Sequence, residues 1–145
     1  MELDRNGLEV LPREECLRLL GTAVLGRVAV SAAALPTILP VNFRFDGRRI
    51  LLRTGRGTKL DAAMRDAVVA FEVDDIAPTA PAGWSVVVTG VARELADREE
   101  LADVARHPVG HWAPPGDDRV VAISTDVVSG RRIVPRQRMN GPRAG

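Results

Sequence analysis

The sequence predicts a mainly β protein, a small antiparallel β-barrel with short helices. Six or seven segments of strand length, rich in Val, Ile and Leu, follow one another along the 145 residues. Short turns rich in Gly, Pro or Asp separate most of them, and the helical segments between them are short. Strands joined in this way pack well as a closed or nearly closed barrel, because closure leaves few unpaired edges.

Length and composition predict a single domain. Hydrophobic residues make up 46% of the chain and charged residues 27%, as in ordinary globular domains. We expect one domain over residues 1–136 and a mobile tail over 137–145, which lacks any hydrophobic periodicity. A net charge of +1 argues against a nucleic-acid partner. No apolar run approaches the roughly 20 residues of a membrane helix, so we expect no membrane partner.

The cysteine content and the N-terminus predict a cytoplasmic protein. Cys16 is the only cysteine, so no disulfide can form within the chain. The first residues include Glu2 and Asp4 and no apolar leader segment. We expect Cys16 to be a small buried side chain rather than a nucleophile.

Three short helices are expected. The first begins at Pro12, which the first helical turn tolerates, and ends before Gly21. The other two each begin at a residue that can cap a helix and carry an acid three positions later. Their ranges are Pro12–Leu20, Thr58–Asp66 and Asp97–Arg106. The side chains expected to face the core are Leu17, Leu20, Leu60, Ala63, Met64, Ala67, Leu101 and Val104.

The strands are predicted from their β-branched residues and the turns between them. The expected ranges are Val24–Ser31, Ile38–Phe45, Arg48–Thr54, Val68–Val73, Trp84–Leu95 and Val120–Val128, with a short seventh strand at Arg131–Val134. The fourth range is apolar except for Glu72, and we expect it to be buried on both faces or nearly so.

Asp46-Gly47 predicts a two-residue hairpin turn, which fixes how the second and third strands pair. In that register the apolar side chains share one face, and we expect it to point inward. Asn42 and Arg53 share the other face as diagonal neighbours, about 7–8 Å apart. This polar face is therefore a candidate ligand site. The predicted pairs are Phe45 with Arg48, Phe43 with Ile50, Val41 with Leu52, and Leu39 with Thr54.

Lys59 is the only lysine, beside nineteen arginines. It lies in Arg53-Thr54-Gly55-Arg56-Gly57-Thr58-Lys59, between a predicted strand and a predicted helix. Guanidinium, ammonium, hydroxyl groups and the free N–H groups of a helix start all suit a phosphate. The alternative is an ordinary glycine-rich turn with a helix cap, since the segment matches no Walker or dinucleotide pattern. The rarity of lysine favours the phosphate site.

The order of several segments resembles the pyridoxamine 5′-phosphate oxidase-like proteins, in particular their short bacterial branch. The resemblance covers about residues 14–134, and it implies a six-stranded, antiparallel, Greek-key-like split barrel. It also implies a homodimer that holds FMN in grooves between the subunits. The segments that carry it are Pro40-Val41-Asn42-Phe43-Arg44-Phe45-Asp46-Gly47, Arg48-Arg49-Ile50-Leu51-Leu52-Arg53-Thr54, Gly57-Thr58-Lys59-Leu60, Val69-Ala70-Phe71-Glu72-Val73-Asp74 and Gly83-Trp84-Ser85-Val86-Val87-Val88-Thr89-Gly90.

The same resemblance implies a set of cofactor-binding residues and no metal ligands. Arg53 and Lys59 would hold the flavin phosphate, and Thr54 and Thr58 would assist them. The residues expected near the ring are Val41, Asn42, Trp84, Ser85 and, from the partner subunit, Arg131. For Trp84, a purely apolar role as a plug of the barrel is an equal alternative. Ser85 stands where the vitamin-forming oxidases carry a longer glutamine, and their C-terminal substrate motif is missing. Pyridoxamine phosphate is therefore not the expected substrate.

By this resemblance the chain is expected to be an FMN-dependent oxidoreductase that acts on a small organic molecule. The flavin performs the electron transfer, which agrees with the lack of a recognisable nucleophile, acid–base pair or metal cluster. No catalytic side chain is identified. One alternative is a deazaflavin-dependent reductase on the same barrel. Another is a module without catalytic activity that binds a flavin, or binds haem through His107 or His111.

Overall fold

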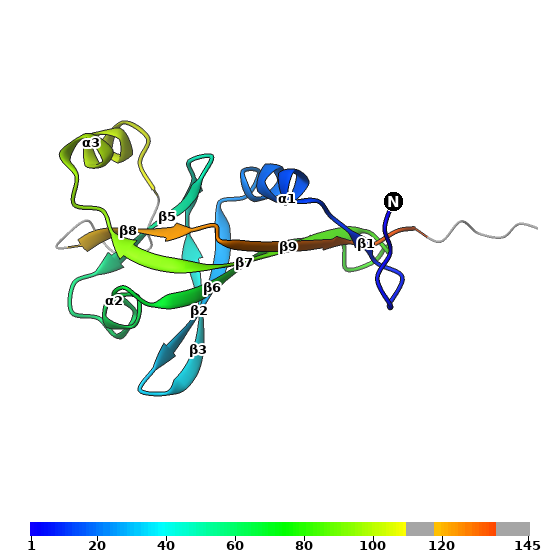
Figure 1. The fold of residues 1–145 in the computed structure, drawn as a ribbon, viewed down its shortest axis with the longest axis horizontal. Helices are drawn as coiled ribbons and strands as arrows, with labels where there is room; N and C mark the ends of the chain where they lie inside the picture. The colour runs from blue at the N-terminus through cyan, green and yellow to red at the C-terminus, as the bar shows by residue number, and fades with distance from the viewer. Residues whose placement is uncertain (110–117, 136–145) are drawn as a thin grey trace, which may run out of the picture.

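The computed structural model describes residues 1–109 and 118–135, in which nine strands form one strongly curled antiparallel sheet (Figure 1). The prediction of a mainly β split barrel with short helices is confirmed, but the expected count of six or seven strands is wrong. The predicted tail at 137–145 lies outside the described residues. The strands are β1 Glu9–Val10, β2 Leu25–Ala32, β3 Leu35–Asn42, β4 Arg44–Phe45, β5 Arg49–Gly55, β6 Val68–Ile76, β7 Gly83–Glu94, β8 Asp118–Ser124 and β9 Val127–Arg132.

The three predicted helices are present and flank the sheet at different places (Figure 1). They are α1 Arg13–Leu20, α2 Lys59–Ala63 and α3 Arg98–Arg106. Thr58 and Asp97 cap α2 and α3 as expected, each accepting a hydrogen bond from the N–H three residues later. The helix α2 is shorter than predicted and is followed by Asp66 in the left-handed region, with φ of 51°. None of the described helices has the length and apolar content needed to span a bilayer.

The long strand β7 joins the two halves of the sheet. It pairs with β6 along most of its length, with β9 through residues 84–89 and with β8 through residues 92–94. Between these two partners, an ideal Cβ built on Gly90 would lie only 1.7 Å from the carbonyl oxygen of Ser124. Only glycine allows this approach of two backbones, which lets the sheet change partners and curl at this point.

The predicted strand Val120–Val128 is divided in the structure. The chain bends at Thr125 and Asp126, so β8 pairs with β5 while β9 pairs with β1 and β7. The bend is held by the Arg13 guanidinium, which donates to the Thr125 carbonyl oxygen at 2.7 Å. The Thr125 hydroxyl in turn donates to the carbonyl oxygen of Arg48 at 2.9 Å. Hydrophobic periodicity gives no information on such side-chain contacts, so it predicted one continuous strand.

The predicted register of the Asp46-Gly47 hairpin is wrong by two residues. Phe45 pairs with Ile50 and Arg44 with Leu51, so the central turn residues are Gly47 and Arg48. Asp46 lies beside the turn, and its carboxylate accepts hydrogen bonds from the N–H groups of Arg48 and Arg49. A shift of two residues keeps each side chain on its own face, so the apolar face still points inward as expected.

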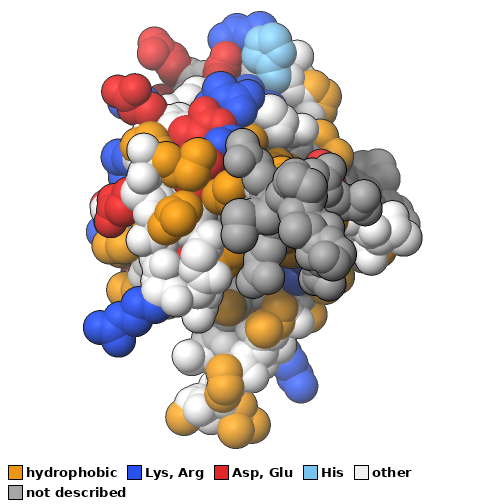
Figure 2. Space-filling model, turned by 90° about the vertical axis from the view of Figure 1, so that its right-hand side faces the viewer, with side chains coloured by type: hydrophobic (Ala, Val, Ile, Leu, Met, Phe, Trp, Pro, Cys, Tyr) orange, Lys and Arg blue, Asp and Glu red, His pale blue; other side chains and the backbone are white. Residues whose placement is uncertain are grey.

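The predicted strand Ile38–Phe45 is also divided, at Phe43. Its first part, β3, pairs with β2 rather than with β5, which places Asn42 opposite Leu25 and Val41 opposite Gly26. The expected pairs of Val41 with Leu52 and of Leu39 with Thr54 therefore do not form. Asn42 is not a cross-strand neighbour of Arg53 either. The long β2–β3 hairpin projects from the body of the protein (Figures 1 and 2).

Two apolar clusters stabilise the sheet. The larger one fills the curl and includes Cys16, which is fully buried as expected. The smaller one lies between the sheet and α3, where Val104 is buried but Leu101 is 37% exposed, contrary to prediction. The strand β6 is buried on one face only, not on both. The outer face of the β3–β2–β6–β7–β9 part of the sheet is therefore open.

We predict that Gly90→Ala lowers the free energy of unfolding by about 3 kcal/mol or more, because the added methyl group would overlap the Ser124 carbonyl. The matched control is Gly21→Ala, where φ is −71° and no heavy atom lies closer than 3.4 Å to the new Cβ. Denaturant unfolding of both variants measures the difference. Equal stabilities of the two variants would contradict the close approach at Gly90.

Candidate functional site

The loop between β5 and α2 is organised by the buried carboxylate of Asp61, which is 5% exposed. The Thr54 hydroxyl donates to Asp61 Oδ1 at 2.9 Å, and the Gly57 N–H donates to Oδ2 at 3.0 Å. The N–H of Asp61 itself donates to Thr58 Oγ1 at 3.1 Å. These three hydrogen bonds fix the loop between the end of the strand and the start of the helix.

Two arginines balance the buried charge of Asp61. Arg119 Nε lies 3.4 Å from Oδ1, and Arg65 Nη2 lies 3.9 Å from Oδ2. Burial alone would raise the pKa of Asp61, but the hydrogen bonds from Gly57 and Thr54 and the two guanidinium groups outweigh it. The pKa therefore lies below its usual value, and Asp61 is ionised at neutral pH.

In the sequence, Asp61 stands out only as the acid three positions after the capping residue Thr58, the pattern of a capping box. The first half of that box forms, because Thr58 accepts from the Asp61 N–H. The second half does not, since the Thr58 N–H donates to the Gly55 carbonyl instead. The acid three positions after a capping threonine was a visible signal, but its use within the loop depended on the tertiary structure.

The residues predicted to hold a phosphate are not joined by a direct contact. Lys59 begins α2, is exposed, and forms an ion pair with none of the residues that the structure describes. Arg53 is turned toward α3, where its Nε donates to the Val109 carbonyl at 3.2 Å and its Nη1 lies 3.4 Å from Asp118 Oδ1. Thr54 is buried and Thr58 is exposed. The binding of one phosphate by these four residues together stays a prediction.

Trp84, Ser85 and Arg131 come together at the far end of β7. Ser85 lies directly opposite Arg131 in the β7–β9 ladder, and Trp84 lies opposite Arg132. Arg131 Nε donates to Asp4 Oδ2 at 3.0 Å. The sheet thus places Arg131 beside Ser85, which lies 46 positions earlier in the sequence, while Trp84 packs against the larger apolar cluster on the opposite face. Their contact with a ligand also stays a prediction.

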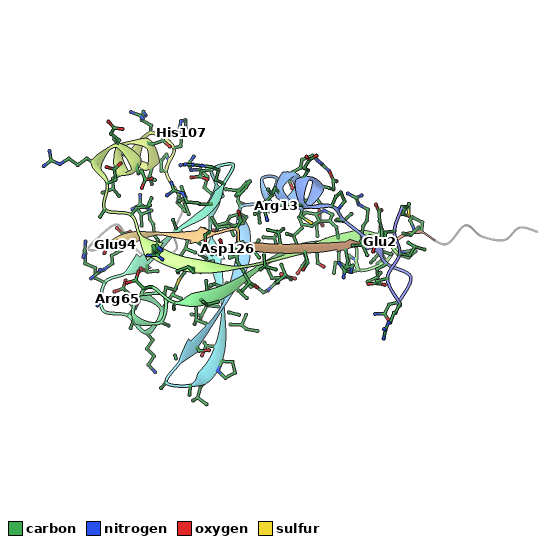
Figure 3. All side chains as sticks on the ribbon, viewed as in Figure 1. Glu2, Arg13, Arg65, Glu94, His107 and Asp126 are labelled. Carbon is green, nitrogen blue, oxygen red and sulfur yellow. The ribbon has the colours of Figure 1, made fainter. Side chains whose placement is uncertain are left out.

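The two groups of predicted residues lie at opposite ends of the sheet. Thr54 is opposite Arg119 in the β5–β8 ladder, and Arg119 donates to the Glu94 carboxylate at the end of β7. Ser85 and Glu94 are nine positions apart on that strand, or about 30 Å at the usual rise per residue. Figure 3 shows Glu94 and Arg65 at one end of the molecule and Glu2, which lies beside β1, at the other. One small ligand cannot touch both groups of a single copy.

A hollow of about 410 Å³ lies on the open face of the sheet, across β3, β2 and β6. At its polar side, Arg27 Nη1 lies 3.3 Å from Glu72 Oε1 and 3.1 Å from Asp74 Oδ2. Burial and the neighbouring Asp74 carboxylate raise the pKa of Glu72 to about 7, despite the opposing effect of Arg27. The hollow is lined by Arg27, Ala29, Ile38, Ala70, Phe71, Glu72 and Asp74.

The Arg27–Glu72–Asp74 cluster was not identified in the sequence, although a signal was present. Acids at alternate positions of a strand lie on the same face, and Glu72 and Asp74 have this spacing. The expectation that this strand is buried on both faces concealed the pattern. The cluster became visible only when the pairing of β2 with β6 placed Arg27 opposite Glu72.

Of the two histidines considered as haem ligands, the structure describes only one. His107 ends α3 and is exposed, and His111 lies outside the described residues. Among residues 1–109 and 118–135, no group of three or more His, Cys, Asp or Glu side chains is placed to hold a metal ion.

With this fold and these residues in place, comparison with known proteins shows the family. Residues 12–132 match the pyridoxamine 5′-phosphate oxidase family, and the chain belongs to it. The match covers all the strands from β2 to β9 and all three helices.

Three similar proteins come from species of Mycobacterium and Corynebacterium. Rv0080, an uncharacterized protein of Mycobacterium tuberculosis, is 43% identical over 88% of this chain and 87% of its own. The structure of an FAD-binding protein from Mycobacterium smegmatis is 35% identical, covers 87% of this chain and 100% of its own, and has a TM-score of 0.75. A structure from Corynebacterium glutamicum, described as a candidate pyridoxamine 5′-phosphate oxidase, is 31% identical, covers 86% and 97% of the two chains, and also has a TM-score of 0.75.

We predict that Glu72→Gln changes how stability depends on pH. Because the folded protein raises the pKa of Glu72 from 4.5 to about 7, it binds this proton more tightly than the unfolded chain does. The stability that this proton provides is fully present below about pH 4.5 and is lost as the pH rises to about 7. Glutamine cannot ionise, so the variant should lose this decline.

Thermal unfolding between pH 4 and pH 8 measures the effect. Relative to the wild type, Glu72→Gln should gain stability as the pH rises across this range. Glu99→Gln, an exposed change on α3, is the matched control. Parallel pH profiles for the wild type and Glu72→Gln would show that Glu72 has no raised pKa.

Proposed function

We propose that this protein binds a flavin and uses it for oxidation or reduction of a small organic molecule. The proposal rests mainly on the match to the pyridoxamine 5′-phosphate oxidase family across residues 12–132. The FAD-binding protein of M. smegmatis, 35% identical across nearly the whole chain, supports a flavin as the cofactor. FMN is the proposed form. FAD is the second candidate because that similar protein binds it.

The proposed chemistry belongs to the flavin ring, which transfers electrons when bound, while the protein binds and orients it. The exposed ammonium of Lys59, together with Thr58, fits the flavin phosphate. Arg53 would join them only by giving up its contacts with Val109 and Asp118. The polar groups of Asn42 and Ser85 are half-buried and suit the edge of a flat heterocyclic ring.

We also propose that two copies assemble to complete the site. The predicted phosphate residues and the Trp84–Ser85–Arg131 group are about 30 Å apart along one chain, which is longer than FMN. A second copy can bring its Arg131 end to the Lys59 end of the first. This arrangement agrees with the expected approach of Arg131 of the partner subunit to the ring.

The surface of the sheet supports assembly through its open face rather than through its edge. The open face carries several apolar side chains that are more than a third exposed, a typical feature of an interface. The edge strand β3 contains Pro36 and Pro40, which have no N–H group to donate to an added strand. The exposed apolar residues on this face are Leu25, Ile38, Val68, Val87 and Val127.

The cofactor is tested with the purified protein. Two absorbance bands of an oxidised flavin, and a released compound that co-migrates with FMN or FAD, would support the proposal and identify the form. A single deazaflavin band would point to the deazaflavin-dependent reductase instead. A protein that binds none of these cofactors, or binds haem alone, would contradict the proposal.

We predict that Lys59→Ala weakens FMN binding by roughly 10- to 150-fold, because one charge-assisted contact to the phosphate contributes about 1.5–3 kcal/mol. Lys59 is exposed, so its removal should leave the unfolding temperature unchanged. Fluorescence titration with FMN measures the affinity. Arg98→Ala, an exposed change on α3, serves as the control. Unchanged affinity in Lys59→Ala would exclude Lys59 from the site.

We predict that Val87→Asp separates the two copies, since Val87 lies at the centre of the open face and is 38% exposed. A buried carboxylate without a partner should raise the dissociation constant of the dimer roughly 100-fold or more. Leu101→Asp is a matched control, because Leu101 is 37% exposed but lies on α3. Sedimentation velocity distinguishes the outcomes. A dimer that tolerates Val87→Asp as well as Leu101→Asp would rule out this face as the interface.

A further inference from the structure

We propose that Asp61 is a positioning residue that makes the β5–α2 loop prefer a flavin that carries a phosphate. This inference rests on the proposed function, because it concerns the same phosphate-binding loop. Asp61 would not touch the ligand. It would act by holding the backbone of residues 54–58 in a shape that presents Lys59 to the phosphate.

The first argument is the number of loop groups that one buried side chain controls. One carboxylate oxygen accepts from the Thr54 hydroxyl at the end of β5, and the other accepts from the Gly57 N–H in the middle of the loop. Gly57 has a φ of 75°, a conformation that glycine adopts easily, with its N–H turned toward Asp61. The loop shape therefore depends on a carboxylate with two accepting oxygens.

The second argument concerns the direction of the positive groups. The N–H groups of Gly57 and Thr58 are both used inside the loop, by Asp61 and by the Gly55 carbonyl. The Thr58 hydroxyl donates to the same carbonyl at 2.8 Å. Lys59 follows immediately and is exposed. Fixing residues 54–58 thus limits where the Lys59 ammonium can reach.

The third argument is that arginines of the same chain compensate the negative charge of Asp61. Arg119 lies between two acids, with its Nε 3.4 Å from Asp61 and its Nη1 2.8 Å from Glu94. Arg65 adds a second positive charge near Asp61. This compensation reduces the repulsion between Asp61 and an anionic ligand. An aspartate with a purely structural role would give the fold stability but no preference for a phosphate.

The test compares FMN with riboflavin, which has the same ring and no phosphate. The variants are Asp61→Asn and, as a matched control, Asp97→Asn, the other aspartate that accepts a backbone N–H near a helix start. Asparagine keeps the shape of the side chain, but it has only one accepting oxygen for the two donors of the loop. Fluorescence titration gives both affinities, and circular dichroism confirms folding.

The wild type and Asp97→Asn should bind FMN at least tenfold more tightly than riboflavin. In Asp61→Asn this ratio should fall to about threefold or less, with riboflavin affinity unchanged. If the ratio is unchanged, or if both affinities fall equally, Asp61 has a structural role only and the inference is wrong. If the wild type itself shows no preference for FMN, the proposed phosphate site is wrong, and this inference fails with it.

A second measurement on the wild type covers the case in which Asp61→Asn does not fold. Amide NMR should show the Gly57 N–H protected from exchange with and without FMN, because Asp61 accepts it in both states. FMN, but not riboflavin, should shift the Lys59 amide signal. Rapid exchange at Gly57, or equal shifts with both flavins, would overturn the proposal.

Discussion

The strand β7 is the constraint on which the rest of the structure depends. It pairs with three strands, β6, β9 and β8. The change of partner from β9 to β8 requires the close approach of the Gly90 and Ser124 backbones. Because β7 is continuous across this junction, it fixes the distance between its two ends. The Ser85–Arg131 pair lies near one end, and Glu94, with Arg119 and the Asp61 loop, lies at the other. The proposal that a second copy completes the site rests on this distance.

Several arginines of this protein differ from Lys59 in their contacts. Arg49 pairs with Glu100 of α3, Arg53 with Asp118 of β8, and Arg119 with Asp61 of α2, so these arginines are fixed by acids of the same chain. Lys59 is exposed and has no such partner among the described residues. An arginine fork suits fixed internal geometry, whereas a flexible ammonium suits a ligand that arrives and leaves. The exposed Lys59 ammonium therefore agrees with the proposed phosphate site.

Much of the fold could be predicted from the sequence, because strands and helix caps are local features. The three helices, the inward face of the hairpin and the burial of Cys16 all followed from periodicity and capping. The errors arose where long-range contacts decide. The Arg13–Thr125 contact divides a predicted strand, and the Asp46 carboxylate moves the hairpin turn by one residue. The role of Asp61 and the cluster around Glu72 likewise required partners from other strands.

The two prolines of β3 have a consequence for how far association can proceed. An edge with free N–H groups would allow one sheet to extend into the next without limit, and the product would be a fibre. Pro36 and Pro40 interrupt such growth while the broad face of the sheet stays available. Contact through a face that is shared by a two-fold axis stops at two molecules. The geometry of this edge therefore favours a finite particle over an open-ended polymer.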